Sequence, residues 1–256
     1  MKNKQKTDTK RLDSISIMSH CGEIENGDLQ NFLEKNTKMF KAFNDSFKKN
    51  QPHLLGENKR ITIWLQDTEN INILAQKIFK LAESINAEIK LYKENITANK
   101  QTSGFLTIVN ANINKIFLLL EADCAFSEDL TLHLNSEISN IDLSEKDWFI
   151  LGSTYHGKHD LSDNASSPDH FNGVAVYQVN QKFKEEIIKS LSRLDTKAIL
   201  CDNYDTLLHK HSNKFRLESQ GGNCIESKYI LNISHPDDKD LDPLLIKKEA
   251  KLVHQK

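Results

Sequence analysis

Two carboxylates, Glu121 and Asp123, form the part of the sequence best suited to chemistry. They follow the apolar run of the stretch NKIFLLLEADCAF (114–126), which predicts a buried strand. On a strand, side chains two positions apart point to the same side, where two carboxylates repel one another unless a cation lies nearby. Mg²⁺ and Mn²⁺ take oxygen ligands from one or two carboxylates and from substrate phosphates. The pair therefore favours a divalent ion that holds a phosphorylated ligand. The alternative is an exposed strand-end Glu121 and an Asp123 that caps the next turn or helix.

The elements that must position these acids alternate along the chain. Strand patterns and helix patterns are predicted in the order strand 13–20, helix 28–49, strand 59–67, helix 69–85, strand 87–95, helix 102–113 (after a Thr/Ser cap) and strand 115–123. Strands that alternate with helices form a mostly parallel sheet covered on both faces. Ligands of such sheets gather at the carboxyl ends of the strands, where helix N-termini also point. The acid pair lies at such an end.

The order of elements changes after Asp123. Strands are predicted at 147–157 and 171–179 around a polar connector, and an amphipathic helix follows at 180–194. This half is therefore expected to be mixed. No repeat of 20 to 50 residues and no linker rich in Pro, Gly or Ser separates the halves, so a single domain is predicted.

Composition excludes several classes of protein. The 256 residues are 38% hydrophobic and 27% charged with a net charge of -2, which is typical of a soluble globular protein without bulk attraction to nucleic acid. No apolar run approaches the roughly 18 to 20 residues of a transmembrane helix, and the Lys-rich start does not read as a signal peptide. We expect a cytoplasmic protein. Its four cysteines have no CxxC spacing, so neither a zinc knuckle nor a disulfide framework is indicated.

The order of these parts resembles a GT-A-type glycosyltransferase. The resemblance covers about Asp13 to Asp240: two strand–helix units, a third strand, a buried strand that ends in an acid-x-acid motif, and a mixed region that contains FNG. In that family the first half binds a nucleotide-sugar, and an Asp-x-Asp-like motif holds the metal that grips the diphosphate. Here the motif is written EAD, with Glu121 in place of the first Asp.

The resemblance implies an α/β fold with a single GT-A-like, Rossmann-like domain and a mostly parallel central sheet with a mixed C-terminal half. The expected division is a basic flexible tail at 1–11, the domain at 12–242 and a basic C-terminal tail at 243–256. Within the domain, 12–126 is the nucleotide-binding half and 127–242 the acceptor half. The implied activity is transfer of a hexosyl or related sugar from a nucleotide-sugar donor to a glycan or glycoconjugate, with Mn²⁺ or Mg²⁺ as cofactor.

The resemblance also implies roles for residues of the first half. Asp67 matches the acid after the second strand that touches the nucleobase or ribose; its alternative is to cap the helix that follows. His20 and Cys21 close the first strand and are expected to line the same crevice. Glu121 is expected to orient the ribose or a water on the metal, and Asp123 to bind the metal.

In the second half, the segment HFNGVAVYQV matches one in which a loop turns sharply into a strand beside the donor sugar. Asn172 has both amide functions for sugar hydroxyls, and Gly173 allows close backbone approach; the alternative is a β-bulge or turn before an ordinary strand. His235 matches a late metal ligand and Lys239 a contact of the diphosphate. A lone strand-end histidine is otherwise exposed and without function.

The acceptor side offers a base and a loop. Inverting transfer requires a carboxylate that removes the acceptor proton, and we favour Asp202 over Asp205; the alternative for Asp202 is a helix N-cap. His156 and His170 flank a polar connector that we interpret as an acceptor-site loop, because it is too polar for a zinc site.

Other nucleotide-dependent classes lack their motifs in this chain. There is no GxGxxG and no Walker sequence, which excludes dinucleotide oxidoreductases and P-loop NTPases. Sugar nucleotidylyltransferases share the nucleotide-binding half but carry an early Gly-rich, basic signature that MSHCGEIENGD lacks. The remaining alternative is a non-catalytic binding or scaffold protein of the same fold, in which the acids serve only as caps.

Overall fold

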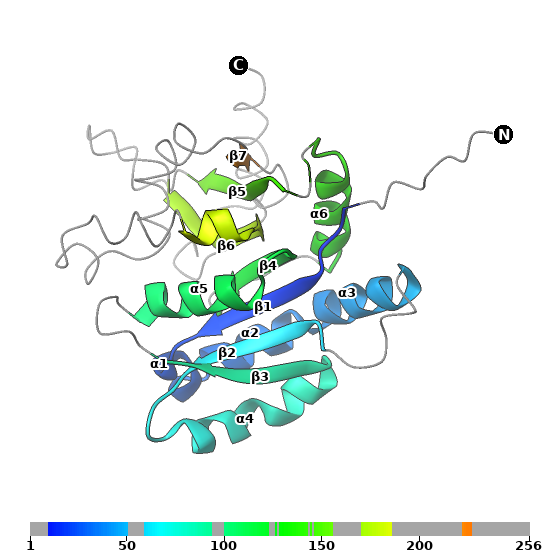
Figure 1. Cartoon of the computed structure of the whole chain (residues 1–256). Helices are drawn as coiled ribbons and strands as arrows, with labels where there is room; N and C mark the ends of the chain where they lie inside the picture. Colours follow the sequence, from blue (N-terminus) through cyan, green and yellow to red (C-terminus); the bar gives the residue numbers. More distant parts are fainter. Residues whose placement is uncertain are drawn as a thin grey trace, which may run out of the picture.

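The computed structural model describes residues 10–50, 59–93, 100–122, 126, 128–142, 144, 146–155, 170–185 and 222–226. Their centre is a seven-stranded sheet in the order β3-β2-β1-β4-β6-β5-β7 (Figure 1). The strands are β1 (Ser14–Ser19), β2 (Ile61–Gln66), β3 (Ala87–Tyr92), β4 (Ile116–Glu121), β5 (Trp148–Tyr155), β6 (His170–Gln178) and β7 (Gly222–Glu226).

The sheet is mostly parallel, with one antiparallel strand in its C-terminal half. Strands β3, β2, β1 and β4 pair in parallel, and β5 pairs in parallel with β7. Strand β6 is antiparallel to both of its neighbours, β4 and β5. The expected α/β class, with a mostly parallel sheet and a mixed second half, is thereby confirmed.

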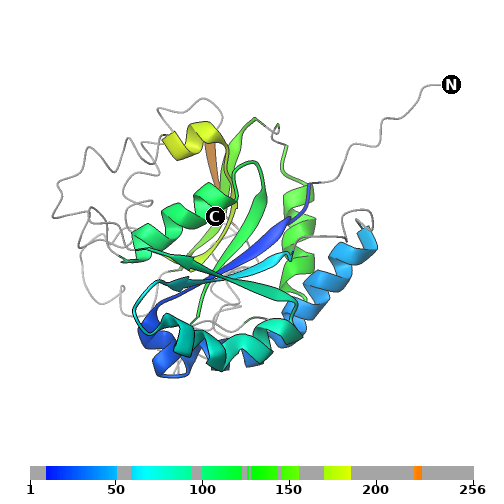
Figure 2. The ribbon, with the colours of Figure 1, turned by 60° about the horizontal axis from the view of Figure 1, so that its bottom comes forward.

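Helices cover both faces of the sheet (Figure 2). They are α1 (Cys21–Glu25), α2 (Asp28–Lys35), α3 (Thr37–Asn50), α4 (Ile71–Ser84), α5 (Lys100–Ala111) and α6 (Leu130–Ser139). One buried cluster joins α2, α3, α4 and α6 to one face, and a second joins α5 and the helical residues 181–185 to the other. None of the described helices is both long and apolar enough to span a membrane.

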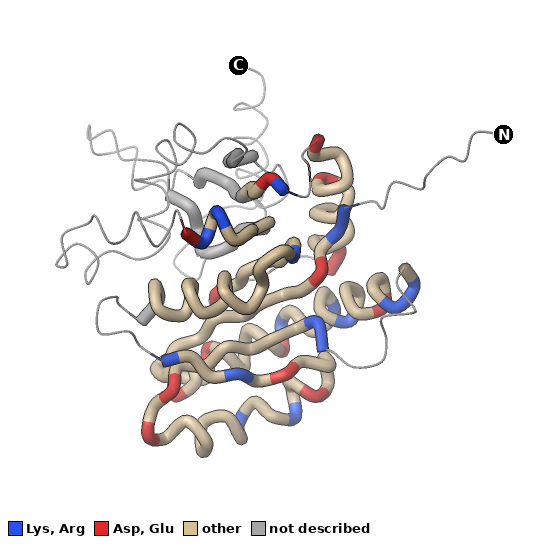
Figure 3. Tube along the Cα trace, viewed as in Figure 1, with Lys and Arg blue, Asp and Glu red and all other residues tan. Residues whose placement is uncertain are grey.

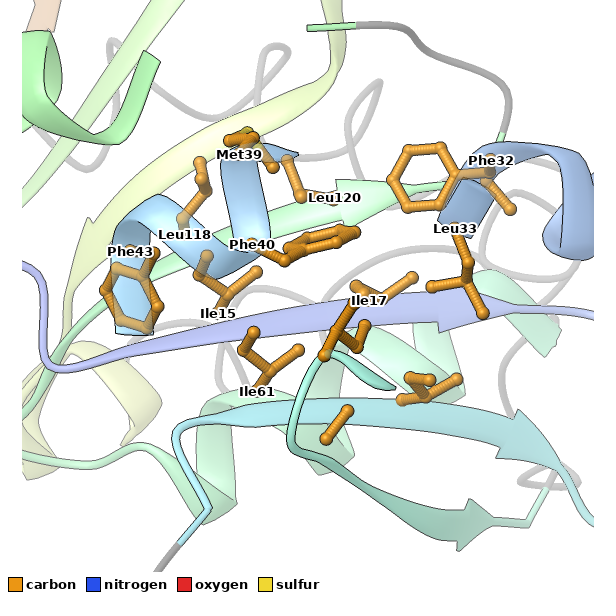
Figure 4. Packing of buried hydrophobic residues seen from close by; sticks show 14 of the residues in the cluster. Ile15, Ile17, Phe32, Leu33, Met39, Phe40, Phe43, Ile61, Leu118 and Leu120 are labelled. Atoms are coloured by element: carbon orange, nitrogen blue, oxygen red, sulfur yellow. The ribbon is translucent and has the colours of Figure 1, made fainter. Parts of the chain in front are cut away.

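The first core cluster shows why β1 and β4 lie at the centre. Alternate residues of each strand enter the two clusters: Leu118 and Leu120 lie in the first, Phe117 and Leu119 in the second, and all four are fully buried. In the first cluster, side chains of α2 and α3 pack over β1, β2 and β4 (Figure 4), namely Phe32, Leu33, Met39, Phe40 and Phe43 over Ile15, Ile17, Ile61, Leu118 and Leu120. Charged residues of both signs are interspersed along the described elements (Figure 3).

Strand β1 buries its polar side as well as its apolar side. Its alternation of polar and apolar residues is typical of a strand with one exposed face, yet all six residues are buried. The serines are accommodated by hydrogen bonds: Ser14 Oγ donates to Asn112 Oδ1 at 2.9 Å, and Ser16 Oγ accepts from Trp64 Nε1 at 3.4 Å and from Asn112 Nδ2 at 3.3 Å. Because buried hydroxyls need such partners, Asn112 of the α5 side specifies the position of this strand.

The single helix predicted over 28–49 is wrong: two helices, α2 and α3, meet at Asn36. The Asn36 side chain is buried, and its Nδ2 donates to the carbonyl of Phe32 at 2.9 Å. An asparagine side chain that competes for backbone groups favours a helix end. The apolar spacing runs through both helices, which is why periodicity alone did not reveal the break.

Two further expectations about helices need correction. Helix α5 begins at Lys100, so Thr102 and Ser103, expected as its cap, lie buried inside it. Helix α6 was not predicted. It follows the acid pair and buries Leu130, Leu134 and Ile138 against the first core cluster.

Asp13 connects the starts of β1 and β4, and its environment makes the stability of the fold depend on pH. Its Oδ2 accepts from the Ile116 amide at 2.8 Å, and burial raises the pKa of its carboxyl above the ordinary 3.8, although that hydrogen bond, Arg60 and Lys115 oppose the shift. A raised pKa means that the folded chain binds the proton more tightly. The contribution of Asp13 to the free energy of unfolding is therefore full below pH 3.8 and is lost as pH rises through the folded pKa.

Asp13→Asn keeps an acceptor for the Ile116 amide but removes this titration. We expect the stability of the wild type relative to Asp13→Asn to fall as pH rises from about 3.5 to neutrality. Urea unfolding of both proteins at several pH values measures the difference, and Asp142→Asn, a change at an exposed acid, is the control. The raised pKa would be contradicted if the stability of the wild type relative to Asp13→Asn stayed constant or rose with pH.

Candidate functional site

The order of strands places a switch point between β1 and β4. From β1 the chain builds β2 and then β3 on one side, and it returns to place β4 on the other side of β1. At such a switch point the connections leave in opposite directions, and ligands of open α/β sheets bind in the gap between them. Helix α1 begins directly after β1 at this edge (Figure 1). The predicted residues His20, Asp67 and Glu121 all lie at the carboxyl ends of their strands.

Glu121 is the last residue of β4 and pairs in register with Met18 of β1. The residues before and after it, Leu120 and Ala122, are buried, whereas Glu121 is partly exposed. Glu121 therefore presents a partly exposed side chain at the carboxyl end of β4. Asp123, the proposed metal ligand, lies outside the described residues.

The chain beyond the acid pair is held against the junction of α2 and α3. The amide of Phe126 donates to Asn36 Oδ1 at 2.9 Å, and the rings of Phe126 and Phe32 meet edge to face, with centroids 6.1 Å apart. Asn36 thus binds Phe32 with its nitrogen and Phe126 with its oxygen. Asn36, a residue that sequence reasoning missed, therefore joins the end of α2 to the chain at Phe126.

His20 is buried, with 8% of its surface exposed, and it lies between two partners. Its Nδ1 lies 2.7 Å from the Tyr92 hydroxyl, and its amide donates to Glu23 Oε2, also at 2.7 Å. Glu23 Oε2 accepts a second hydrogen bond from Ser19 Oγ at 2.7 Å. Neither Tyr92 nor Glu23 was predicted. The spacing of Glu23, three residues after the residue that precedes a helix, is the signal of a capping residue and could have revealed it.

Cys21 and Asp67 tie the ends of β1, β2 and β3 together. Cys21 Sγ lies 3.2 Å from Thr68 Oγ1, and the amide of Asp67 donates to the carbonyl of Tyr92 at 2.7 Å. The Asp67 carboxylate is partly exposed and lies 3.9 Å from Lys93 Nζ. The alternative interpretation of Asp67 as a helix cap is wrong, because α4 begins at Ile71 after Asn70.

Asn172 and Gly173 lie within strand β6 and not in a loop before it. Between paired positions, β5 advances by two residues, from Gly152 to Thr154, while β6 advances by four, from Ala175 to Phe171. The irregularity therefore places Asn172 and Gly173 in a bulge, the alternative weighed for this segment. Bulges are common beside active sites because they re-aim a side chain.

The remaining predicted residues are not brought together by the described structure. His170 is the first residue of β6, at the far end of the bulge, and its side chain is not described. The other predicted site residues that lie outside the described residues are His156, Asp202, Asp205, His235 and Lys239. Within the described ranges, no group of three or more His, Cys, Asp or Glu residues could hold a metal ion. Both proposed metal ligands, Asp123 and His235, fall outside those ranges.

Comparison with known proteins gives likeness in fold only. No family model matches the chain, and no curated protein sequence matches it. Among solved structures, the inositol-1-phosphate CTP transferase from T. maritima is 10% identical, with a TM-score of 0.48, and the match covers 93% of this chain and 95% of that one. A putative glucose-1-phosphate thymidylyltransferase from Bacillus anthracis is 11% identical over 84% of this chain and 86% of that one, with a TM-score of 0.44.

A third structure belongs to a glycosyltransferase. The mannosyltransferase PcManGT from Pyrobaculum calidifontis, in complex with GDP-Man and Mn²⁺, is 13% identical over 86% of this chain and has a TM-score of 0.42. The chain spans 55% of that protein's length. At identities this low, similarity concerns the path of the chain and not the activity.

Proposed function

We propose that this protein is a metal-dependent glycosyltransferase that moves a sugar from a nucleotide-sugar to a glycan or glycoconjugate acceptor. The observation that carries the proposal is the gathering of His20, Asp67 and Glu121 at the carboxyl ends of β1, β2 and β4, around the switch point of the sheet. A crevice at this place suits an extended nucleotide ligand. The sequence resemblance built on EAD supplies the reaction class.

The first half supplies the donor site in this proposal. Asp67 is partly exposed at the end of β2 and accepts hydrogen bonds from the ribose or base. His20 lines the same crevice, and Glu121 orients the ribose or a metal-bound water. Asn172 and Gly173 lie on a bulge, where the strand backbone departs from regular pairing and can approach the donor sugar. Lys239 neutralises charge on the diphosphate.

Asp123 and His235 are the proposed ligands of Mn²⁺ or Mg²⁺. A bound divalent ion neutralises the negative charge that develops on the leaving nucleoside diphosphate. Glu121 sits two residues before Asp123, at a strand end held in register by β1. Phe126, three residues after Asp123, donates its amide to Asn36 Oδ1. Binding of an ion requires ligands that are held close to one position, and both of these contacts lie within three residues of Asp123 in the sequence.

The acceptor side rests on residues of the second half. Asp202, or Asp205 in its place, removes the proton of the attacking hydroxyl if the transfer inverts the anomeric centre. His156 and His170 border the acceptor. His170 begins β6, the strand that carries the bulge, so donor and acceptor contacts are proposed on one strand.

Thermal melting with nucleotides and metal tests the donor site. A ligand that binds only the folded protein raises the melting temperature by mass action, equivalent to about 2.7 kcal/mol at a concentration 100 times the dissociation constant. We expect at least one of UDP, GDP, ADP and CMP to raise the melting temperature with Mn²⁺ present and none to do so in EDTA. Absence of any shift with all four nucleotides and Mn²⁺ contradicts the proposal. A nucleotide shift without sugar transfer to any acceptor supports the binding or scaffold alternative.

A further inference from the structure

Tyr92 reaches across the end of a strand to His20. The sheet order β3-β2-β1 places the whole of β2 between the strands that carry the two residues. Nevertheless the Tyr92 hydroxyl lies 2.7 Å from His20 Nδ1, and the two rings meet edge to face at 75°. Because His20 and Asp67 directly follow β1 and β2, and Tyr92 ends β3, the contact lies at the same edge of the sheet as Asp67.

The Tyr92 ring has little freedom to move. It is 1% exposed and belongs to the second core cluster together with Met18. Helix α5 approaches it at Gly104, where an added Cβ would lie 3.1 Å from Tyr92 Cζ and 2.6 Å from Met18 Sδ. The carbonyl of Tyr92 is bound by the amide of Asp67 at 2.7 Å. Packing and backbone thus hold the hydroxyl within hydrogen-bond distance of His20 Nδ1.

The backbone of His20 is fixed independently. Its amide donates to Glu23 Oε2, which also accepts from the Ser19 hydroxyl. The imidazole is therefore held from two directions, by Glu23 through the main chain and by Tyr92 through the ring. A neutral imidazole has one N–H and one lone pair, and the hydrogen bond at one nitrogen decides which nitrogen keeps the proton.

We propose that Tyr92 is a positioning residue. Its hydroxyl donates a hydrogen bond to His20 Nδ1 and so holds His20 as the tautomer with its proton on Nε2. A phenol buried in the core needs an acceptor, and Nδ1 offers a lone pair at hydrogen-bond distance. Since Nε2 then carries hydrogen, His20 acts as a hydrogen-bond donor and not as a metal ligand, for which a lone pair is required. That this donor serves the nucleotide rests on the proposed function.

The tautomer of His20 can be measured without any ligand. In long-range ¹H–¹⁵N spectra of the full chain, the two ring nitrogens resonate at well-separated frequencies according to which one is protonated, and His20→Gln identifies the His20 signals among those of the ten histidines. We expect a single neutral form with the proton on Nε2 in the wild type. In Tyr92→Phe, which removes only the hydroxyl, we expect a shift toward the other tautomer.

Two further variants separate positioning from packing. Tyr177→Phe removes the hydroxyl of another buried tyrosine in the same core cluster and is expected to leave the His20 signals unchanged. Gly104→Ala keeps the hydroxyl but crowds the Tyr92 ring, and it is expected to shift the His20 signals as Tyr92→Phe does. A wild-type His20 with its proton on Nδ1, or His20 signals that do not respond to Tyr92→Phe, overturns the proposal.

Nucleotide affinity gives the second readout. For whichever of the four nucleotides raises the wild-type melting temperature with Mn²⁺, Tyr92→Phe is expected to weaken binding about two- to tenfold, the equivalent of one net hydrogen bond. Tyr177→Phe is expected to bind as the wild type does. If none of the four binds the wild type, the proposed function fails, while the tautomer measurement still decides the role of Tyr92. Unaltered binding by a Tyr92→Phe protein with a shifted tautomer overturns the link between His20 and the nucleotide.

Discussion

Leu118→Asp is expected to prevent soluble folding altogether. Leu118 is fully buried on β4, where it pairs with Ile15 on one side and Val176 on the other. The change forfeits about 1.5–3 kcal/mol of apolar burial and places an unpaired carboxylate in the core, which costs several kcal/mol more. Together these losses approach the 5–15 kcal/mol that stabilises a typical domain. Expression yield in the soluble fraction and a thermal melt measure the effect.

The matched control is the same substitution on the surface. Leu132 of α6 is 48% exposed, so Leu132→Asp is expected to change stability by no more than about 0.5 kcal/mol. Leu118→Ala gives an intermediate case, with an expected loss of about 2–5 kcal/mol. A soluble Leu118→Asp protein with a cooperative melt would contradict the central position of β4, and the proposed donor site beside it would then lose its structural basis.

The central strands were predictable because each has a simple physical signature. The run KIFLLL has no polar face to expose, which requires a strand buried on both sides, and β4 lies between β1 and β6 as a central strand does. Strand β2 and helix α4 appear where the pattern places them. The strand β1 was predicted in position but not in burial, because its serines are satisfied by Asn112, about a hundred residues away.

Features that depend on contacts between distant residues could not be predicted in this way. The helix break at Asn36 depends on a buried amide that also binds Phe126, 90 residues further along the chain. The contact between His20 and Tyr92 depends on the order of three strands and on the absence of a side chain at Gly104. Sequence spacing carries no record of such pairs, although it did identify His20 and Asp67 as strand-end residues of one edge.

The division of the chain into halves remains a prediction, as do the roles assigned to the residues of both halves. What the described structure adds is position: His20, Asp67 and Glu121 share one edge, and the chain after Glu121 returns to Asn36. Asp67 does not cap α4, because Asn70 is the residue that precedes this helix. Helix capping therefore does not explain an acid at position 67. These observations therefore concern only the residues proposed for the donor side.

Asp123→Asn is the change with the largest expected effect on function. Asn keeps the size of Asp and caps a turn or helix equally well, but it lacks the negative charge that a divalent ion requires. If Asp123 only caps the chain after β4, the change is nearly silent. If Asp123 binds the metal, the variant folds normally and Mn²⁺-dependent nucleotide binding falls about 10- to 100-fold or more, beyond detection for a weak ligand.

Two comparisons make this result specific. His235→Ala is expected to weaken the same binding less than Asp123→Asn does, because water can replace one ligand of the ion. Asp142→Asn removes one negative charge at an exposed position outside the crevice and is expected to bind as the wild type does. Isothermal titration of each protein with nucleotide and Mn²⁺, with circular dichroism to confirm folding, gives the affinities. A folded Asp123→Asn protein with unchanged metal-dependent binding would remove EAD from the site, because a carboxylate whose charge is dispensable cannot be the group that holds the ion.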